Sequence, residues 1–361
     1  MLLASLRKKH TAKAELHSAR SIIWGIFFFL MLTVIFGVFT GKWEDQHNPE
    51  KRNIFFRRGW VKHVLSADKI KRPDKLIVII SNSQGYGREL SDRETYPALL
   101  EKYLILRQKE NVRVLNWSIP GGQVPDFTIL AAAAKRLAPD ILIFVDSPAD
   151  FSNNRMELDP KKGLRKNFIS DCHFLLWFSN IRKSIPSAFL AHFIRPIDYL
   201  DIFFAHIFAP WRYRDIFTSR LMQIEELRPF DKSGKSEKWF FQTAVPRQWY
   251  VDHLRAASTK AQTTTRPINI SSISLELLSY FLDTTQDMKG EKYFVFMPLH
   301  SSIQKKNSLL LNEFTIRSAA KGFKVVDLSN KVPDNQYLTL THFNAAGHAT
   351  MAHLFVDLLA K

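Results

Sequence analysis

Cysteine is almost absent from this chain of 361 residues, where Cys172 is the only one. A single thiol forms no disulfide within its own chain, which excludes the small disulfide-stapled scaffolds. The sequence also contains no C-x-x-C, H-E-x-x-H or G-x-x-x-x-G-K-[ST] motif. Neither a zinc site of those kinds nor a phosphate-binding loop is therefore predicted. We expect no metal and no cofactor.

Acidic residues are also in the minority, while apolar residues are abundant. Lys and Arg number 51 against 34 Asp and Glu, a formal net charge of +17, and 46% of the residues are hydrophobic and 13% aromatic. A chain of this composition can bury a core, and its aromatic content argues against a disordered protein. The charge favours an anionic partner such as nucleic acid, phospholipid headgroups or an acidic glycan, and composition does not choose among them.

A long uncharged segment near the N-terminus favours the membrane. Residues 21–41, SIIWGIFFFLMLTVIFGVFTG, carry no charge, and a helix of that length reaches roughly 30 Å, the hydrocarbon thickness of a bilayer. We expect an uncleaved transmembrane anchor. Residues 1–20 carry more net positive charge than the residues that follow the segment. The positive-inside rule therefore puts residues 1–20 in the cytosol and the rest of the chain on the outer, extracytoplasmic face.

Beyond a linker over residues 42–74, short β-branched segments alternate with segments of helical periodicity. Buried parallel strands are predicted at residues 76–81, 112–118, 141–147, 293–299 and 323–329. Helices are predicted at residues 96–108, 125–137, 275–285, 308–320 and 344–359. The alternation predicts an α/β fold over residues 75–361, a three-layer α/β/α sandwich with a mainly parallel five-stranded sheet. Ligands are expected beyond the carboxyl ends of its strands.

The alternation stops between residues 151 and 268, which are rich in aromatic and basic side chains. Pro186, Pro196 and Pro210 divide this insertion into helices too short to span a bilayer. One interpretation is a helical insertion with a small core of its own. The other is a surface that lies on the membrane or on a membrane-embedded partner, where aromatic and basic residues are favoured.

Two segments carry candidate chemistry. Ser83 follows the first predicted strand in SNSQGYG, so we expect it at the carboxyl edge of the sheet, where its backbone N–H can face a reacting oxygen. A serine needs a base to take its proton. His342 in THFNAAGH, just before the last predicted helix, is the candidate base. Either segment alone is a weak signal.

Taken in order, these segments resemble the SGNH branch of the GDSL-like hydrolase superfamily. Ser83 matches the nucleophile of that family's first block, and HFNAAGH matches the fifth block. Gly121 in NWSIPGGQVPD matches the glycine of the second block, with Gly122 as its neighbour, and VDSPADF falls where the third block is expected. The resemblance implies an acyl-serine intermediate, with His342 as general base and the N–H groups of Ser83 and Gly121 holding the oxyanion.

Several positions depart from the family's pattern. Ser81 and Asn82 replace the Gly-Asp pair of the first block, Ala149 replaces an oxyanion-binding asparagine, and Thr339 stands where the fifth block has an acid. Loss of that acid commonly costs orders of magnitude in rate, and an oxyanion donor contributes about 2.7–4 kcal/mol. Asp334, in the loop before the histidine, is the candidate substitute acid.

Asn153 and Asn154 are the candidate substitutes for the missing oxyanion-binding asparagine. Two classes of function stay open. One, which the resemblance implies, is a membrane-anchored serine esterase or O-acyltransferase that acts on acyl groups of cell-envelope polysaccharide, as some family members do beside a multi-pass membrane acyltransferase. The other is a catalytically inactive binding or assembly subunit for the same glycan or the same membrane partner. Nucleic acid is not an expected partner. His300 and His348 are predicted to be structural.

Overall fold

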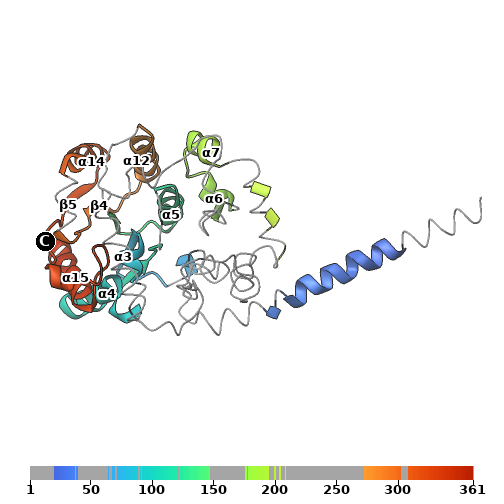
Figure 1. Ribbon diagram of the computed structural model, residues 1–361, viewed down its shortest axis with the longest axis horizontal. Helices are drawn as coiled ribbons and strands as arrows, with labels where there is room; N and C mark the ends of the chain where they lie inside the picture. Colours follow the sequence, from blue (N-terminus) through green and yellow to red (C-terminus); the bar gives the residue numbers. More distant parts are fainter. Residues whose placement is uncertain are drawn as a thin grey trace, which may run out of the picture.

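The computed structural model places the predicted α/β domain and a few segments around it (Figure 1). It describes residues 20–36, 38–39, 64, 67–69, 71–87, 90, 92–119, 122, 124–146, 175–176, 178–194, 199–200, 203–204, 208, 272–301 and 308–360.

Five parallel strands form one sheet in the order β2-β1-β3-β4-β5. Their bounds are β1 (Lys75–Ser81), β2 (Val112–Asn116), β3 (Ile141–Asp146), β4 (Glu291–Phe296) and β5 (Lys324–Asp327). The next strand in the chain after β1 is β2, which lies on one side of β1, whereas β3 lies on its other side. The strand order therefore reverses at β1. Ligands of open α/β sheets bind at such a switch point, beyond the carboxyl ends of the strands.

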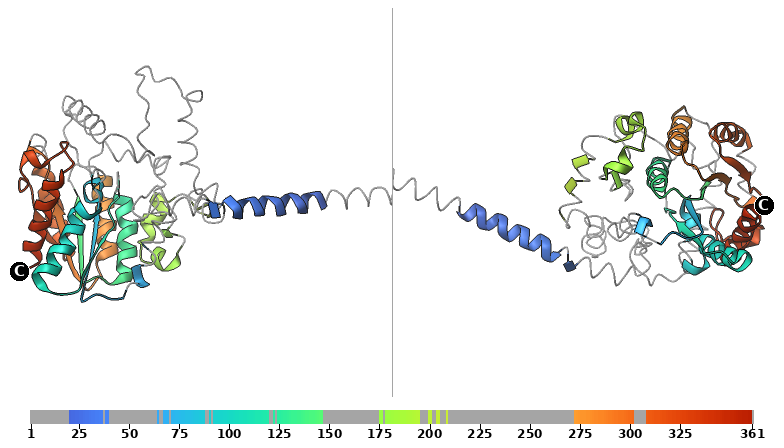
Figure 2. Two further views of the ribbon diagram at one scale, coloured as in Figure 1. Left: turned by 90° about the horizontal axis from the view of Figure 1, so that it is seen from below. Right: turned by 180° about the vertical axis from the view of Figure 1, so that it is seen from behind.

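Helices cover both faces of the sheet (Figures 1 and 2). On one face lie α4 (Tyr96–Gln108) and α15 (Ala345–Leu359), and on the other lie α5 (Val124–Leu137), α12 (Ser272–Thr285) and α14 (Ser308–Ala320). Along β1, Ile77 and Ile79 are buried in the core beneath α4 and α15, and Val78 and Ile80 are buried in the core beneath α5, α12 and α14. A strand buried on both faces is apolar at every position, which explains the continuous LIVII segment. The three-layer α/β/α sandwich is confirmed.

The described part of the insertion packs against the main domain. It contains the short helices α6 (Ser179–Arg182) and α7 (Ser187–Phe193), with Pro186 as the residue before α7. Ile181 and Phe189 are buried in the same core as α5 and α12, so the expected separate small core is wrong for these residues. Most of residues 151–268 lies outside the described residues, and the membrane-facing interpretation stays a prediction.

Residues 20–36 form a helix whose apolar side chains are mostly exposed. In the part of the chain that the structure describes, no helix is both long enough and apolar enough to cross a membrane. The transmembrane anchor predicted over residues 21–41 is therefore not supported. Residues 37, 40 and 41 lie outside the described residues, as do residues 1–19 and most of the predicted linker.

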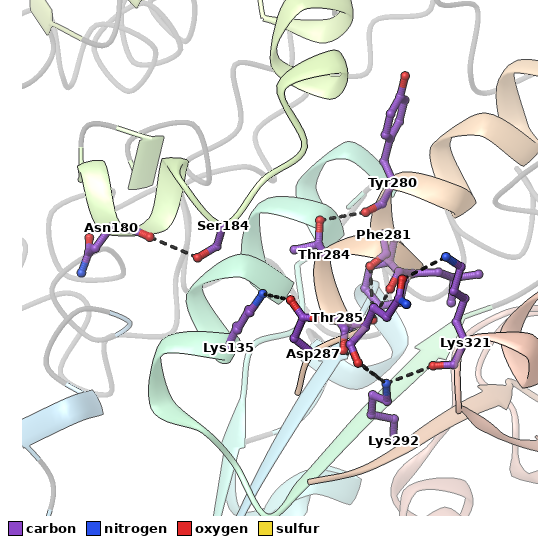
Figure 3. A network of polar contacts seen from close by, with 12 residues as sticks. Lys135, Asn180, Ser184, Tyr280, Phe281, Thr284, Thr285, Asp287, Lys292 and Lys321 are labelled. Carbon is purple, nitrogen blue, oxygen red and sulfur yellow. Dashed lines mark hydrogen bonds and ion pairs between the residues drawn. The ribbon is translucent and has the colours of Figure 1, made fainter. Parts of the chain in front are cut away.

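One buried lysine holds two helices to the amino edge of the sheet. Lys292, near the start of β4, donates from Nζ to the carbonyls of Thr285 and Gln286 at the end of α12, both at 3.3 Å (Figure 3). It also donates to the carbonyl of Lys321, just after α14, at 3.0 Å. The carboxyl end of a helix dipole favours a cation. Burial lowers the pKa of Lys292, and these carbonyls compensate for the water that the ammonium has lost.

Candidate active site

Ser83 lies directly past the carboxyl end of β1, as the first residue of the short helix α3 (Ser83–Tyr86). The side chain of Asn82 caps this helix, because its Oδ1 accepts the backbone N–H of Gln84 at 3.0 Å. Asn82 also donates from Nδ2 to Asp146 Oδ1 at the end of β3, at 3.1 Å, and both side chains are buried. The turn that carries the serine is therefore tied to the neighbouring strand, and the expected position of Ser83 at the sheet edge is confirmed.

The α3 helix packs on the strand ends without room for a side chain at Gly85. A Cβ atom built there would lie 2.7 Å from Ser81 Cβ and 2.8 Å from the Tyr96 hydroxyl, and it would also contact Ser118 Oγ. The Gly85 carbonyl accepts a hydrogen bond from Asn116 Nδ2 at 3.0 Å. Glycine is needed here because backbone and buried strand ends approach closely.

His342 reaches the same place from the loop before α15. Its Nε2 atom lies 2.9 Å from Ser83 Oγ. The α15 helix starts after Asn344, whose side chain accepts the Gly347 N–H at 3.0 Å, and this cap fixes where the loop ends. The structure thus brings together the two residues that the sequence predicts as nucleophile and base.

Gln84, which the sequence analysis did not single out, fastens the histidine loop to the serine helix. Its Nε2 donates to the carbonyl of Thr341, the residue before His342, and its side chain is buried. Its position in the sequence could have indicated this role, since the long side chain of a glutamine directly after Ser83 can reach the loop that carries His342. This bond ties the loop that carries His342 to the helix that carries Ser83.

Hydroxyl groups face the other ring nitrogen of His342. Thr339 Oγ1 lies 3.1 Å and Thr341 Oγ1 lies 3.3 Å from Nδ1. Thr339 is the residue that stands where the resemblance implies an acid, and it is only 5% exposed. The position is filled by a neutral group that can either donate or accept a hydrogen bond.

Asp334 does not replace the missing acid. Its two carboxylate oxygens accept the backbone N–H of Ser301 at 2.9 Å and the Ser301 hydroxyl at 2.6 Å. Its Oδ1 also lies 3.8 Å from His300 Nδ1. The bonds from Ser301 hold the pKa of Asp334 below its usual range. Asp334 is the first residue of the 3-10 turn η7 (Asp334–Gln336), and its carboxylate binds Ser301 in the loop after β4, so the predicted pairing with His342 is wrong.

The oxyanion site is described only in part. As the first residue of α3, Ser83 has a backbone N–H without an intrahelical partner. Gly122 donates its N–H to the Ile119 carbonyl at 2.9 Å, so it does not offer that group to a substrate. The oxyanion role of Gly121 stays a prediction, because it lies outside the described residues. So do the third-block residue Ala149 and the candidate donors Asn153 and Asn154.

His348 is structural, as expected. Its buried Nδ1 accepts the backbone N–H of Tyr96 at 3.1 Å, at the start of α4, and the two rings are stacked with centroids 5.8 Å apart. Burial raises the pKa of the Tyr96 phenol, which therefore stays neutral beneath α3. Within the described ranges, no group of three or more His, Cys, Asp and Glu side chains is placed to hold a metal ion.

Comparisons with known proteins find similarity among solved structures alone. No family model matches the sequence, and no curated protein matches it. The chain is similar to an alpha/beta hydrolase enzyme from the metagenome of Lake Arreo, Spain, with 12% identity, a TM-score of 0.35, and coverage of 80% of this chain and 97% of that one. It is similar to a member of the lipolytic protein G-D-S-L family from Veillonella parvula (10% identity, TM-score 0.35, coverage 80% and 99%). It is also similar to a catalytic mutant of Axe2, an acetylxylan esterase from Geobacillus stearothermophilus (9% identity, TM-score 0.36, coverage 80% and 95%). Because these identities and TM-scores are low, a functional conclusion has to rest on the geometry of the site.

Proposed function

We propose that this protein is a serine-dependent acyl esterase or O-acyltransferase, with Ser83 as nucleophile and His342 as general base. The observation that carries the proposal is the 2.9 Å distance between Ser83 Oγ and His342 Nε2. A nucleophile and a base within hydrogen-bonding reach, at the carboxyl edge of a parallel sheet, is the arrangement that acyl transfer needs.

The reaction follows from the positions of these groups. Ser83 Oγ attacks the acyl carbon while its proton moves to His342 Nε2, and the N–H of Ser83 faces the oxyanion that develops. The leaving alkoxide then takes the proton from Nε2, which leaves an acyl-serine. Water (hydrolysis) or a sugar hydroxyl (transfer) attacks the acyl-serine in the second half of the reaction, and its proton passes through the same imidazole to Ser83.

The substrate we propose is an acyl group on a cell-envelope polysaccharide. The net charge of +17 suits an anionic surface or glycan. A membrane-bound position on the outer face and a multi-pass membrane acyltransferase as partner are predictions from the sequence, and they extend the same proposal. They are tested separately from the chemistry of Ser83.

One observation favours the alternative, a catalytically inactive subunit that binds the glycan or the membrane partner. The ring nitrogen of His342 that a carboxylate orients in a serine triad faces the hydroxyls of Thr339 and Thr341 instead. A neutral partner stabilises the charged imidazole less than a carboxylate does, so the intact fold is compatible with very slow chemistry.

The test is labelling of the full chain by a fluorophosphonate, together with hydrolysis of p-nitrophenyl acetate. We expect the probe to label wild-type protein, and we expect Ser83→Ala and His342→Ala to abolish labelling and hydrolysis. Ser301→Ala is the matched control, since Ser301 bonds Asp334 outside the site; it should be labelled at the wild-type rate. Absence of labelling in the wild type, or equal labelling of Ser83→Ala, would favour the binding subunit.

A further inference from the structure

We propose that Thr339 holds the neutral imidazole of His342 in the tautomer that carries its proton on Nε2. In the resting site, an N–H group then faces Ser83, where catalysis needs a lone pair. The inference rests on the proposed function for its consequence, and it adds how the same site is kept at rest.

The hydroxyl of Thr339 is surrounded by donors and acceptors that fix where its proton points. Thr339 Oγ1 accepts the backbone N–H of His342 at 3.0 Å and that of Thr341 at 3.3 Å. A threonine hydroxyl has two lone pairs and one proton, so these two bonds fill its acceptor capacity.

The hydroxyl proton of Thr339 then has one partner among the described residues, His342 Nδ1 at 3.1 Å. Thr339 is 5% exposed, so water has little access to take that proton. A buried donor is rarely left without an acceptor. Thr339 therefore donates to Nδ1, and Nδ1 of the neutral ring carries no proton.

The consequence falls on Ser83. A neutral imidazole with a bare Nδ1 has its proton on Nε2, and that N–H donates to Ser83 Oγ across 2.9 Å. In this tautomer Nε2 cannot take the serine proton. The tautomer that can act as a base, called the base form below, carries its proton on Nδ1. Thr341 Oγ1, 3.3 Å from Nδ1, can accept a hydrogen bond from that proton.

Adopting the base form leaves the buried Thr339 proton without a partner. An unmade buried hydrogen bond of this kind disfavours the base form by roughly tenfold to a hundredfold. Thr339 is thus a positioning residue that acts through His342, and it lowers the resting reactivity of Ser83.

An acceptor at position 339 should reverse the preference. In Thr339→Asp the carboxylate only accepts, so His342 donates from Nδ1–H to it and presents the Nε2 lone pair to Ser83. We expect p-nitrophenyl acetate hydrolysis to rise at least tenfold. The acidic limb of its pH profile should move to higher pH, because the carboxylate favours the protonated imidazole.

The tautomer itself is measured by 15N NMR of the histidine rings in the full chain, with His342→Gln to assign the signal. We expect the Nε2–H form in the wild type and in the conservative Thr339→Ser. Thr339→Asp should show the Nδ1–H form or the imidazolium. Thr341→Val is the matched control and should keep the wild-type tautomer, since Thr341 is not the resting partner of Nδ1.

The outcomes separate this inference from the proposed function. An Nδ1–H tautomer in the wild type would overturn the role of Thr339 whatever the activity. An Nε2–H tautomer in the wild type, lost in Thr339→Asp, supports that role even if every variant is inactive and labelling of Ser83 fails. In that case the esterase proposal falls and the positioning role stands.

Discussion

Gly85→Ala should separate the candidate nucleophile from its base. The new Cβ would lie 2.7 Å from Ser81 Cβ and 2.8 Å from the Tyr96 hydroxyl, and it would contact Ser118 Oγ. All three neighbours are buried, so the four-residue helix α3 has to move instead. Ser83 is the first residue of that helix and moves with it.

The magnitude follows from two opposing effects. Overpacking costs about 1–3 kcal/mol, and replacing Gly by Ala within a helix returns about 0.5–1 kcal/mol. The difference is a net loss in the free energy of unfolding of at most about 2.5 kcal/mol, with a midpoint near 1 kcal/mol that lowers Tm by about 2–4 °C. A displacement near 1 Å at the reacting group costs on the order of a hundredfold in rate. Fluorophosphonate labelling should therefore slow far more than the small loss of folded protein explains.

Gly290→Ala is the matched control at the opposite edge of the sheet. A Cβ there would contact the Pro139 carbonyl and lie 2.7 Å from the carbonyl oxygen of Asp140, both backbone atoms, so a loss in Tm at least as large is expected, with labelling retained. Thermal unfolding and labelling rates of the two variants give the comparison. An unchanged Tm and labelling rate in Gly85→Ala would refute the tight packing of α3. An equal loss of labelling in both variants would show that the effect is global.

Two further substitutions test the supports of the site and of the fold. Gln84→Leu removes the bond to the Thr341 carbonyl and should slow labelling of Ser83 at least tenfold, while the unfolding free energy falls by about 1–2 kcal/mol; a wild-type labelling rate would contradict the role of Gln84. Lys292→Met keeps the side-chain volume but removes the ammonium that three carbonyls share, of which that of Thr285 still accepts the Met288 N–H. Urea denaturation should show that the free energy of unfolding falls by about 2–4 kcal/mol. A fall no larger than that of the more exposed control Lys324→Met would contradict the stabilising role of Lys292.

Hydrophobic periodicity along the chain was sufficient to predict the layers and the order of the elements. Strands buried on both faces are apolar without interruption, so segments such as residues 76–81 were recognisable locally. The predicted helix over residues 96–108 agrees with α4 to the residue. The Ser83 and His342 pair was predicted from the resemblance of their two segments to the SGNH blocks, and the structure places both at the carboxyl edge of the same parallel sheet.

The groups that surround Ser83 and His342 depend on how distant loops fold together, and the sequence did not predict them. Asp334 is the nearest acid before His342 in the chain, yet the η7 turn directs its carboxylate to Ser301, and the buried hydroxyl of Thr339 faces the imidazole instead. Such contacts depend on the path of irregular loops, which leave no periodic pattern in the sequence. The same reason applies to Gln84, whose partner lies 257 residues away. Periodicity fixes the faces that are buried, whereas the partner of a single polar side chain is set by the folded positions of distant segments.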